Sequence, residues 1–170
     1  PVAHGRLGGN LLLNPGAESG SLDSWAIEGE FRRGENLARF FTDYLVPRAG
    51  DGMFMAYPSR EAGDTSLSQT VDLPAAARYL RWGGCLKSFA SVMGIGVEVE
   101  VLDASEAVLD STGTGPLLCA QWERVSGLLR VPAGARRARF TVSAGGRGRA
   151  AFADDLCLEA LGSTDGAAWF

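Results

Sequence analysis

The sequence has very few of the side chains on which common enzyme mechanisms depend. Histidine occurs once, at His4, in a glycine-rich leader. A catalytic triad or a histidine general base is therefore excluded from the body of the chain. The motifs of nucleophile elbows, nucleotide-binding loops and zinc proteases are also missing. The glycine run from Gly145 to Gly148 joins two expected strands, so it is a turn. We expect a protein that is not an enzyme.

Basic charge and long hydrophobic runs are lacking as well. The formal net charge is −4 at pH 7, whereas a nucleic-acid-binding protein needs a basic surface. No apolar run approaches the roughly 20 residues that a membrane-spanning helix requires. We therefore expect neither nucleic acid nor membrane as a partner.

Cysteine is scarce and unevenly placed. The three residues Cys85, Cys119 and Cys157 are widely spaced and form no C-x-x-C pair. This pattern excludes a disulfide framework and is poor for a zinc site. Cys157 alternates with Leu156 and Leu158, so a partly buried thiol is expected there. One disulfide among the three stays open if the protein is secreted.

The abundant features are glycine, with 23 of 170 residues, and alternation of apolar and polar residues. The clearest alternation runs from Ile95 to Val101, with Glu98 and Glu100 on the outer side. Residues 28–47 leave helix and strand open, and 103–118 are expected to be a loop. A length of 170 residues fits one domain. Expected strands span 10–13, 25–27, 53–57, 66–73, 78–89, 95–101, 122–131, 137–143 and 150–160.

This spacing of strands predicts an all-β fold, an antiparallel β-sandwich of the jelly-roll type. Residues 10–161 are expected to form the domain. Residues 1–9 form a flexible lead-in, and residues 162–170 form a tail without a pattern.

Four motifs occur in an order that resembles a known family. They are Asn10-Leu-Leu-Leu-Asn-Pro-Gly-Ala-Glu18 with Trp25, Ser66-Leu-Ser-Gln-Thr-Val-Asp-Leu73 followed by Tyr79-Leu-Arg-Trp82, Trp122-Glu-Arg-Val125, and Phe152-Ala-Asp-Asp-Leu156. Together they resemble the β-jelly-roll carbohydrate-binding modules of the xylan- and glucan-binding type, within the galactose-binding-domain-like superfamily. The first motif is also similar to the start of the F-box-associated sugar-binding domain, although the later motifs fit the first family better.

The resemblance implies a noncatalytic, lectin-like module that belongs to a larger extracellular or cell-surface protein and binds a glycan or polysaccharide. The alternative is a structural, adhesion or protein-interaction domain of the same fold, whose charged sheet face contacts another protein.

The resemblance also implies a structural Ca²⁺ between Glu18 and Asp154. Calcium takes six to eight oxygen ligands, which carboxylates and backbone carbonyls supply. Asp154 has the strand parity of Phe152 and Leu156, so its carboxylate is expected on the core side, where it needs a partner. Alternatively, Glu18 caps a turn and Asp154 accepts backbone hydrogen bonds. Asp155, of opposite parity, is expected to be a solvated neighbour.

A sugar-binding face is harder to place from the sequence. Trp25, Trp82 and Trp122 fall at the alternate positions on the core side of their strands, so we expect them to pack in the core. The aromatic residues Phe40, Phe41, Tyr44 and Tyr57 are candidates for a sugar-stacking platform, but the sequence does not fix where they lie. The positions opposite the core are mostly charged, which suits an acidic glycan or a protein, although Arg–Glu pairing across strands also explains them. The candidate ligand-binding residues are Tyr79, Arg81, Lys87, Glu98, Glu100, Arg137 and Arg139.

Overall fold

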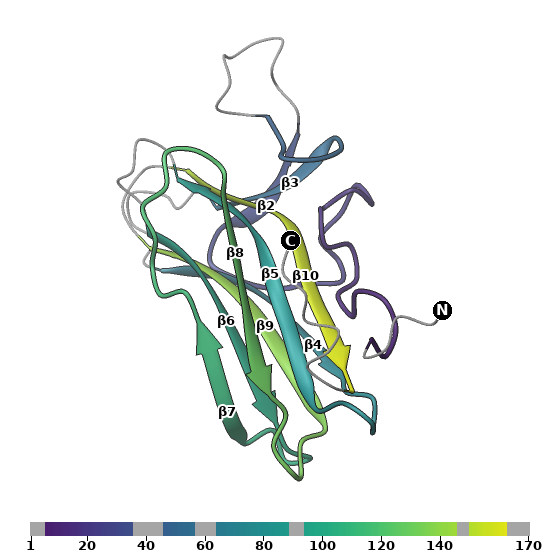
Figure 1. The fold of residues 1–170 in the computed structure, drawn as a ribbon. Coiled ribbons are helices and arrows are strands. Elements are labelled where there is room, and N and C mark those ends of the chain that lie inside the picture. Colours follow the sequence, from purple (N-terminus) through teal and green to yellow (C-terminus); the bar gives the residue numbers. More distant parts are fainter. Residues whose placement is uncertain (1–5, 36–45, 57–63, 89–93, 146–149, 163–170) are drawn as a thin grey trace.

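The protein is a sandwich of two five-stranded antiparallel sheets (Figure 1). The computed structural model describes residues 6–35, 46–56, 64–88, 94–145 and 150–162. One sheet, here called the β5 sheet, has the order β2-β3-β10-β5-β8, and the other, the β6 sheet, has the order β1-β4-β9-β6-β7. The strands are β1 (Ala26–Glu28), β2 (Phe31–Glu35), β3 (Gly52–Ala56), β4 (Thr65–Asp72), β5 (Tyr79–Ser88), β6 (Gly94–Leu102), β7 (Val108–Gly113), β8 (Glu123–Arg130), β9 (Arg137–Gly145) and β10 (Ala151–Leu161).

The core lies between the two sheets and follows from the alternation. Val97 and Phe140 point inward from the β6 sheet, and Leu80 points inward from the β5 sheet, each with 2% or less of its surface exposed. The Trp25 ring joins the two layers, because its centroid lies 5.1 Å from that of Phe54 and 6.5 Å from that of Phe140. Burial of one face of each strand is what holds two such sheets together. The predicted all-β jelly-roll sandwich is confirmed.

The first motif is not a strand, contrary to the prediction for residues 10–13. Instead, the side chain of Asn10 takes the place of a strand partner: its Nδ2 donates to the Leu156 carbonyl at 2.8 Å and its Oδ1 accepts from the Leu158 amide at 2.9 Å. Leu7, which the sequence places in a flexible lead-in, donates its amide to the Ala160 carbonyl. The start of the described chain is therefore attached along β10.

Strand β7 lies where the sequence predicts a loop. It is an edge strand of the β6 sheet, and most of its residues are exposed, including Val108 at 50% and Leu109 at 40%. A strand that buries neither face carries no period-two hydrophobic signal, so its pattern could not be distinguished from a polar loop.

A β-bulge in β10 overturns the predicted orientation of Asp154. Ala151 and Ala153 pack in the main core, whereas Phe152 packs in a separate cluster with Met53. The register then shifts between Asp154 and Cys157. Phe152 and Asp154 therefore lie on the outer side of the sheet, whereas Leu156, which follows the bulge, lies in the core.

Candidate functional site

A groove crosses the outer face of the β5 sheet, and its position follows from the strand register. Gly83 pairs with Cys157 of β10 and with Ser126 of β8, which makes a cross-strand row of small side chains. Larger side chains stand in the rows on either side of it. Paired residues of antiparallel strands share a face, so this row is the floor of a hollow of about 230 Å³. We call it the transverse groove; its polar walls are Arg6, Arg81, Arg124, Asp155 and Glu159.

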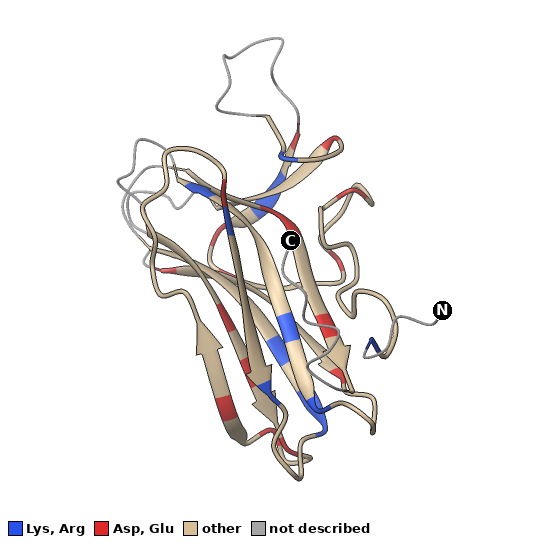
Figure 2. Ribbon diagram, viewed as in Figure 1, with Lys and Arg blue, Asp and Glu red and all other residues tan. Residues whose placement is uncertain are grey.

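Two of the arginines in the transverse groove are already bonded to a carboxylate. Glu159 lies between Arg81, with which it forms an ion pair, and Arg6, whose Nη2 is 3.2 Å from Glu159 Oε1. Figure 2 shows a basic band on β5 next to an acidic band on β10. Arg81 is thus largely buried and held in place, which differs from the exposed ligand-binding role predicted for it.

Arg124 and Asp155 are the other charged residues of the groove. Both are exposed, and within the described parts of the chain neither side chain forms an ion pair. Arg124 pairs with Cys85 of β5, which in turn pairs with Asp154 of β10. The backbones of Arg124 and Asp155 are therefore about two strand spacings, or roughly 9–10 Å, apart.

The bulge determines where Asp155 points. Its φ of 51° lies in the left-handed region, which aspartate tolerates better than most residues. Bulges next to binding sites commonly redirect a side chain. Here the additional residue of β10 lines the groove, whereas the sequence predicted only a solvated neighbour.

The other end of the same outer face is occupied by the chain itself. Trp122 Nε1 donates to the Val46 carbonyl at 3.1 Å, and the Lys87 ammonium lies 5.9 Å from the centre of the Trp122 ring. Lys87 is only 4% exposed. The prediction of Lys87 as a ligand-binding side chain is therefore not supported by its position, and Trp122 packs on this outer face and not in the main core.

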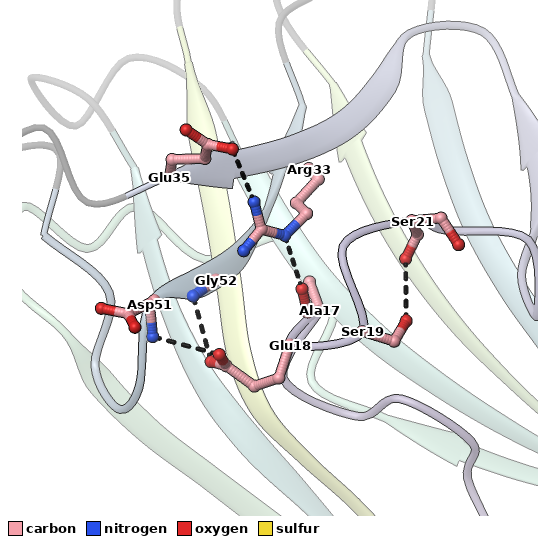
Figure 3. A network of polar contacts seen from close by, with 8 residues as sticks. All are labelled: Ala17, Glu18, Ser19, Ser21, Arg33, Glu35, Asp51 and Gly52. Atoms are coloured by element: carbon pink, nitrogen blue, oxygen red, sulfur yellow. Dashed lines mark hydrogen bonds and ion pairs between the residues drawn. The ribbon is translucent and has the colours of Figure 1, made fainter.

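Glu18 and Asp154 both accept backbone hydrogen bonds, which is the arrangement that the sequence analysis gave as the alternative to a metal site. Glu18 accepts from the amides of Asp51 at 3.1 Å and Gly52 at 3.0 Å (Figure 3). Asp154 accepts from the amides of Arg48 at 2.8 Å and Ala49 at 3.0 Å through Oδ2, and from its neighbour Asp155 at 2.8 Å through Oδ1. The two carboxylates thus fasten the chain before β3 to the first motif and to β10.

Glycines permit this approach of the two carboxylates. A side chain at Gly16 would begin 3.3 Å from Asp154 Oδ1 and 3.8 Å from Glu18 Oε1, so both oxygens border one point. At Gly50 it would begin 2.9 Å from Glu18 Oε2, and φ there is +61°. Asp154 is fully buried, and burial raises its pKa to about 6.

The carboxylate pair fits a hard cation only with the help of backbone oxygens. Within the described ranges, no group of three His, Cys, Asp or Glu side chains gathers in one place. Two carboxylates are present. The carboxylate of Asp154 is buried, and among the described residues no Lys or Arg side chain is bonded to it. Calcium accepts such an all-oxygen set, whereas zinc sites typically contain histidine or cysteine ligands.

Four of the remaining predicted ligand-binding residues belong to the other sheet of the sandwich. Glu98 and Glu100 belong to β6 and Arg137 and Arg139 to β9, both in the β6 sheet, whereas Tyr79 is on β5. The prediction of one common charged face is therefore wrong.

Ion pairs account for much of this second charged surface. Arg139 Nε lies 2.6 Å from Glu100 Oε2, and this hydrogen bond raises the pKa of Arg139. Arg137 pairs with Glu106 at 2.7 Å. Arg139 and Glu100 thus pair across strands, whereas the partner of Arg137 lies in the turn between β6 and β7, and Glu98 forms no ion pair among the described residues. The predicted platform of Phe40, Phe41, Tyr44 and Tyr57 lies outside the described residues.

Sequence reasoning missed Arg6, Arg124, Asn10 and Gln69. Only Gln69 gave a signal, as an amide on the core side of β4; it bonds to both backbone groups of Leu13. All three cysteines are free thiols, which is the outcome without the disulfide that the sequence left open, and Cys157 is partly buried as expected. No helix among the described residues has the length and apolarity to cross a membrane.

Comparison with known proteins supports the architecture. No protein-family model and no curated protein matches the sequence. A CBM61 module solved with β-1,4-galactotriose superimposes with a TM-score of 0.62 at 25% identity, over 88% of this chain and 97% of the module. The chain has the fold of the jelly-roll carbohydrate-binding modules.

Further structures agree with this assignment. A family 16 carbohydrate-binding module has a TM-score of 0.66 at 18% identity, over 88% of this chain and 99% of that one. The enzymatically active domain of tailspike protein 4 from bacteriophage CBA120 has a TM-score of 0.71 at 16% identity, over 89% of this chain but only 21% of the tailspike chain. This jelly roll thus occurs both as a separate module and within a larger enzyme.

Proposed function

We propose that the protein is a noncatalytic carbohydrate-binding module of a larger extracellular or cell-surface protein, and that it holds a saccharide in the transverse groove. One observation carries this proposal: the positively charged Arg124 and the negatively charged Asp155 are both exposed in one groove and form no ion pair with each other. A sugar hydroxyl donates and accepts hydrogen bonds at once. A pyranose placed between these residues satisfies both, because its hydroxyls accept from the guanidinium and donate to the carboxylate.

The size of the groove fits this ligand. Its volume of about 230 Å³ is below the roughly 300–1,000 Å³ of typical small-molecule pockets. It therefore suits one sugar residue of a chain, with the bare backbone of Gly83 allowing the ring to approach the sheet closely.

Titration with soluble polysaccharides tests glycan binding, and Cys157 locates it. This thiol lines the groove and is partly exposed, whereas Cys85 and Cys119 are buried. We expect iodoacetamide to label Cys157 first, and bound saccharide to slow that labelling. If saturating glycan left the rate of Cys157 labelling unchanged, the glycan would bind outside the groove. If the protein bound no glycan at all, the proposed function would be refuted.

We further propose that Glu18 and Asp154 hold a structural calcium ion, together with backbone carbonyls of the adjoining turns. The support is the buried carboxylate of Asp154 and the convergence of both groups on Gly16. Bound calcium would supply the positive charge that stabilises the ionised form of Asp154. It would thereby fasten the first motif to β10.

Melting curves in calcium and in chelator test the metal. A ligand that binds only the folded state raises stability by mass action, by about 2.7 kcal/mol at a concentration one hundred times its Kd. We expect calcium to raise the Tm of the wild type and to leave that of Glu18→Ala unchanged. Identical wild-type curves in both buffers would refute the calcium site.

A further inference from the structure

We infer that the sugar residue held in the transverse groove is acidic, carrying a carboxylate or a sulfate group. This inference rests on the proposed saccharide binding and names the class of the sugar. Three guanidinium groups against two carboxylates line the groove, which gives it a formal charge of +1. The whole chain, in contrast, has a net charge of −4. The groove is therefore a local basic site on an acidic protein.

Arg124 is the residue suited to bind the acidic group. It is exposed at the edge strand β8, and within the described parts of the chain it has no ion-pair partner. Its row neighbour Cys85 and the next outward residue on its own strand, Ser126, are both uncharged. A guanidinium presents paired donors that match the oxygens of a carboxylate or sulfate group. Glu159, by contrast, already engages Arg6 and Arg81.

Asp155 gives the ligand a direction. It stands on β10 at the opposite end of the groove from Arg124, about two strand spacings away. A second anion beside Asp155 would be repelled, whereas hydroxyl groups there would donate to it. The acidic group of the sugar therefore points to the β8 edge and the ring hydroxyls point to β10.

Affinity measurements on the full chain test the inference. The probes are polygalacturonate, a sulfated galactan, neutral β-1,4-galactan and neutral xylan, each at low and at moderate salt. We expect at least one acidic polymer to bind about tenfold more tightly than the neutral ones, the worth of a charge-assisted hydrogen bond. That preference should shrink as salt is added, because screening weakens exposed charge pairs.

Two matched variants identify the residue. Arg124→Gln should lose about tenfold in affinity for the acidic polymer and keep its melting temperature, since Arg124 is exposed and has no ion-pair partner among the described residues. Arg130→Gln, on the same outer face of β8 but outside the groove, should behave like the wild type. Tighter binding of polygalacturonate would identify the acidic group as a carboxylate, and tighter binding of the sulfated galactan would identify it as a sulfate.

The outcomes separate this inference from the proposed function. Equal or tighter binding of the neutral polymers, independent of salt, overturns the acidic sugar and leaves glycan binding intact. The acidic sugar also fails if both arginine variants bind the acidic polymer like the wild type. Binding of none of the polymers, with Cys157 labelling unchanged by any of them, overturns both.

Discussion

Gly127 shows how closely single residues are packed in this sandwich. It pairs with Trp82 across β5 and β8, and the Trp82 indole occupies the place that a side chain at Gly127 would take. A side chain at Gly127 would begin 2.7 Å from Trp82 Nε1 and closer still to the ring carbons. The Trp82 side chain is itself buried in the core.

We therefore expect Gly127→Ala to lower the free energy of unfolding by about 1–3 kcal/mol, the usual cost of overpacking a core. Urea denaturation followed by tryptophan fluorescence measures it. Gly9→Ala is the control, since no atom of the described residues lies within 4 Å of the position that its side chain would take. A Gly127→Ala midpoint equal to that of Gly9→Ala would show that the indole has room.

Asp154 gives the metal-free protein a defined pH dependence. Burial raises its pKa in the folded state to about 6, above the roughly 3.9 of an unfolded aspartate. The folded state then binds the proton more tightly than the unfolded state. Stability from this residue is therefore present below the unfolded pKa and is lost as pH rises through the folded pKa.

In chelator, we expect the free energy of unfolding to rise by about 2 kcal/mol as the pH is lowered from 7 to 4, because each unit of difference between the folded and unfolded pKa corresponds to about 1.36 kcal/mol and the unfolded aspartate is only half protonated near pH 4. Asp154→Asn should flatten this profile. Asp103 affects stability in the opposite direction. The hydrogen bond from Ser105 lowers its pKa in the folded state, so the stability that Asp103 contributes is lost as the pH falls through that pKa. A wild-type profile that falls between pH 7 and 4 would contradict the assignment to Asp154.

At the scale of elements, β10 organises the first motif. The two Asn10 bonds to the backbone of β10 have partners far away in sequence and lie partly out of water. Removing the Asn10 side chain would leave a carbonyl and an amide of β10 without partners, which costs about 1–3 kcal/mol for each buried group.

We expect Asn10→Ala to lower stability by about 2–4 kcal/mol and to speed hydrogen exchange at the Leu158 amide, which donates to Asn10. Ser21→Ala, which removes an exposed hydrogen bond to Asp23, is the control and should change stability by less than about 0.5 kcal/mol. Unchanged protection of Leu158 would mean that this bond is not retained in solution.

The strands that bury one face were predicted from the sequence, because β4, β6 and β9 carry period-two alternation. Residues without that signal were misjudged. β7 buries neither face, and the bulge in β10 reverses the alternation within one strand, so the position of Asp154 was assigned to the wrong side. Assigning side chains to the two faces of a strand by counting alternate residues fails at a bulge, because nothing in the local sequence fixes where the additional residue is placed.

The sequence predicted part of the candidate site: the motif resemblance named Glu18 and Asp154, and strand alternation named Arg81, which lines the groove. Glu18 and Asp154 are 136 positions apart in the numbering and nevertheless border Gly16 together. The charged residues were assigned to one face because parity tells inside from outside but does not tell which sheet a strand joins. Strand order separates Arg81 on one sheet from Arg139 on the other.

At the scale of the whole molecule, the proposed metal site and the groove are adjacent. Asp154 and Asp155 are consecutive, and the Asp155 amide donates to Asp154 Oδ1. A calcium ion on Asp154 would thus fix the bulge that places Asp155 in the groove. Since coupling between two binding sites is reciprocal, each ligand should then strengthen the other.

We expect glycan affinity to fall when calcium is removed with chelator, and calcium affinity to rise when the groove is filled. Calorimetric titration of each ligand, with and without the other bound, measures the factor by which each affinity changes. These two factors must be equal. Glu18→Ala should abolish the effect of calcium on glycan binding. Equal glycan affinity with and without calcium would show that the two sites are independent.

The bulge also bears on how this chain should be aligned with others. Three residue steps along β10, from Asp154 to Cys157, oppose two steps along β5, from Cys85 to Gly83. Asp155 is thus an insertion of one residue into an otherwise regular strand. A relative that lacks this insertion would keep the same core, yet an alignment without a gap would match its residues after this point to the wrong side of the sheet. Aligning at Asp155 with a single gap identifies which relatives retain the acidic wall of the groove.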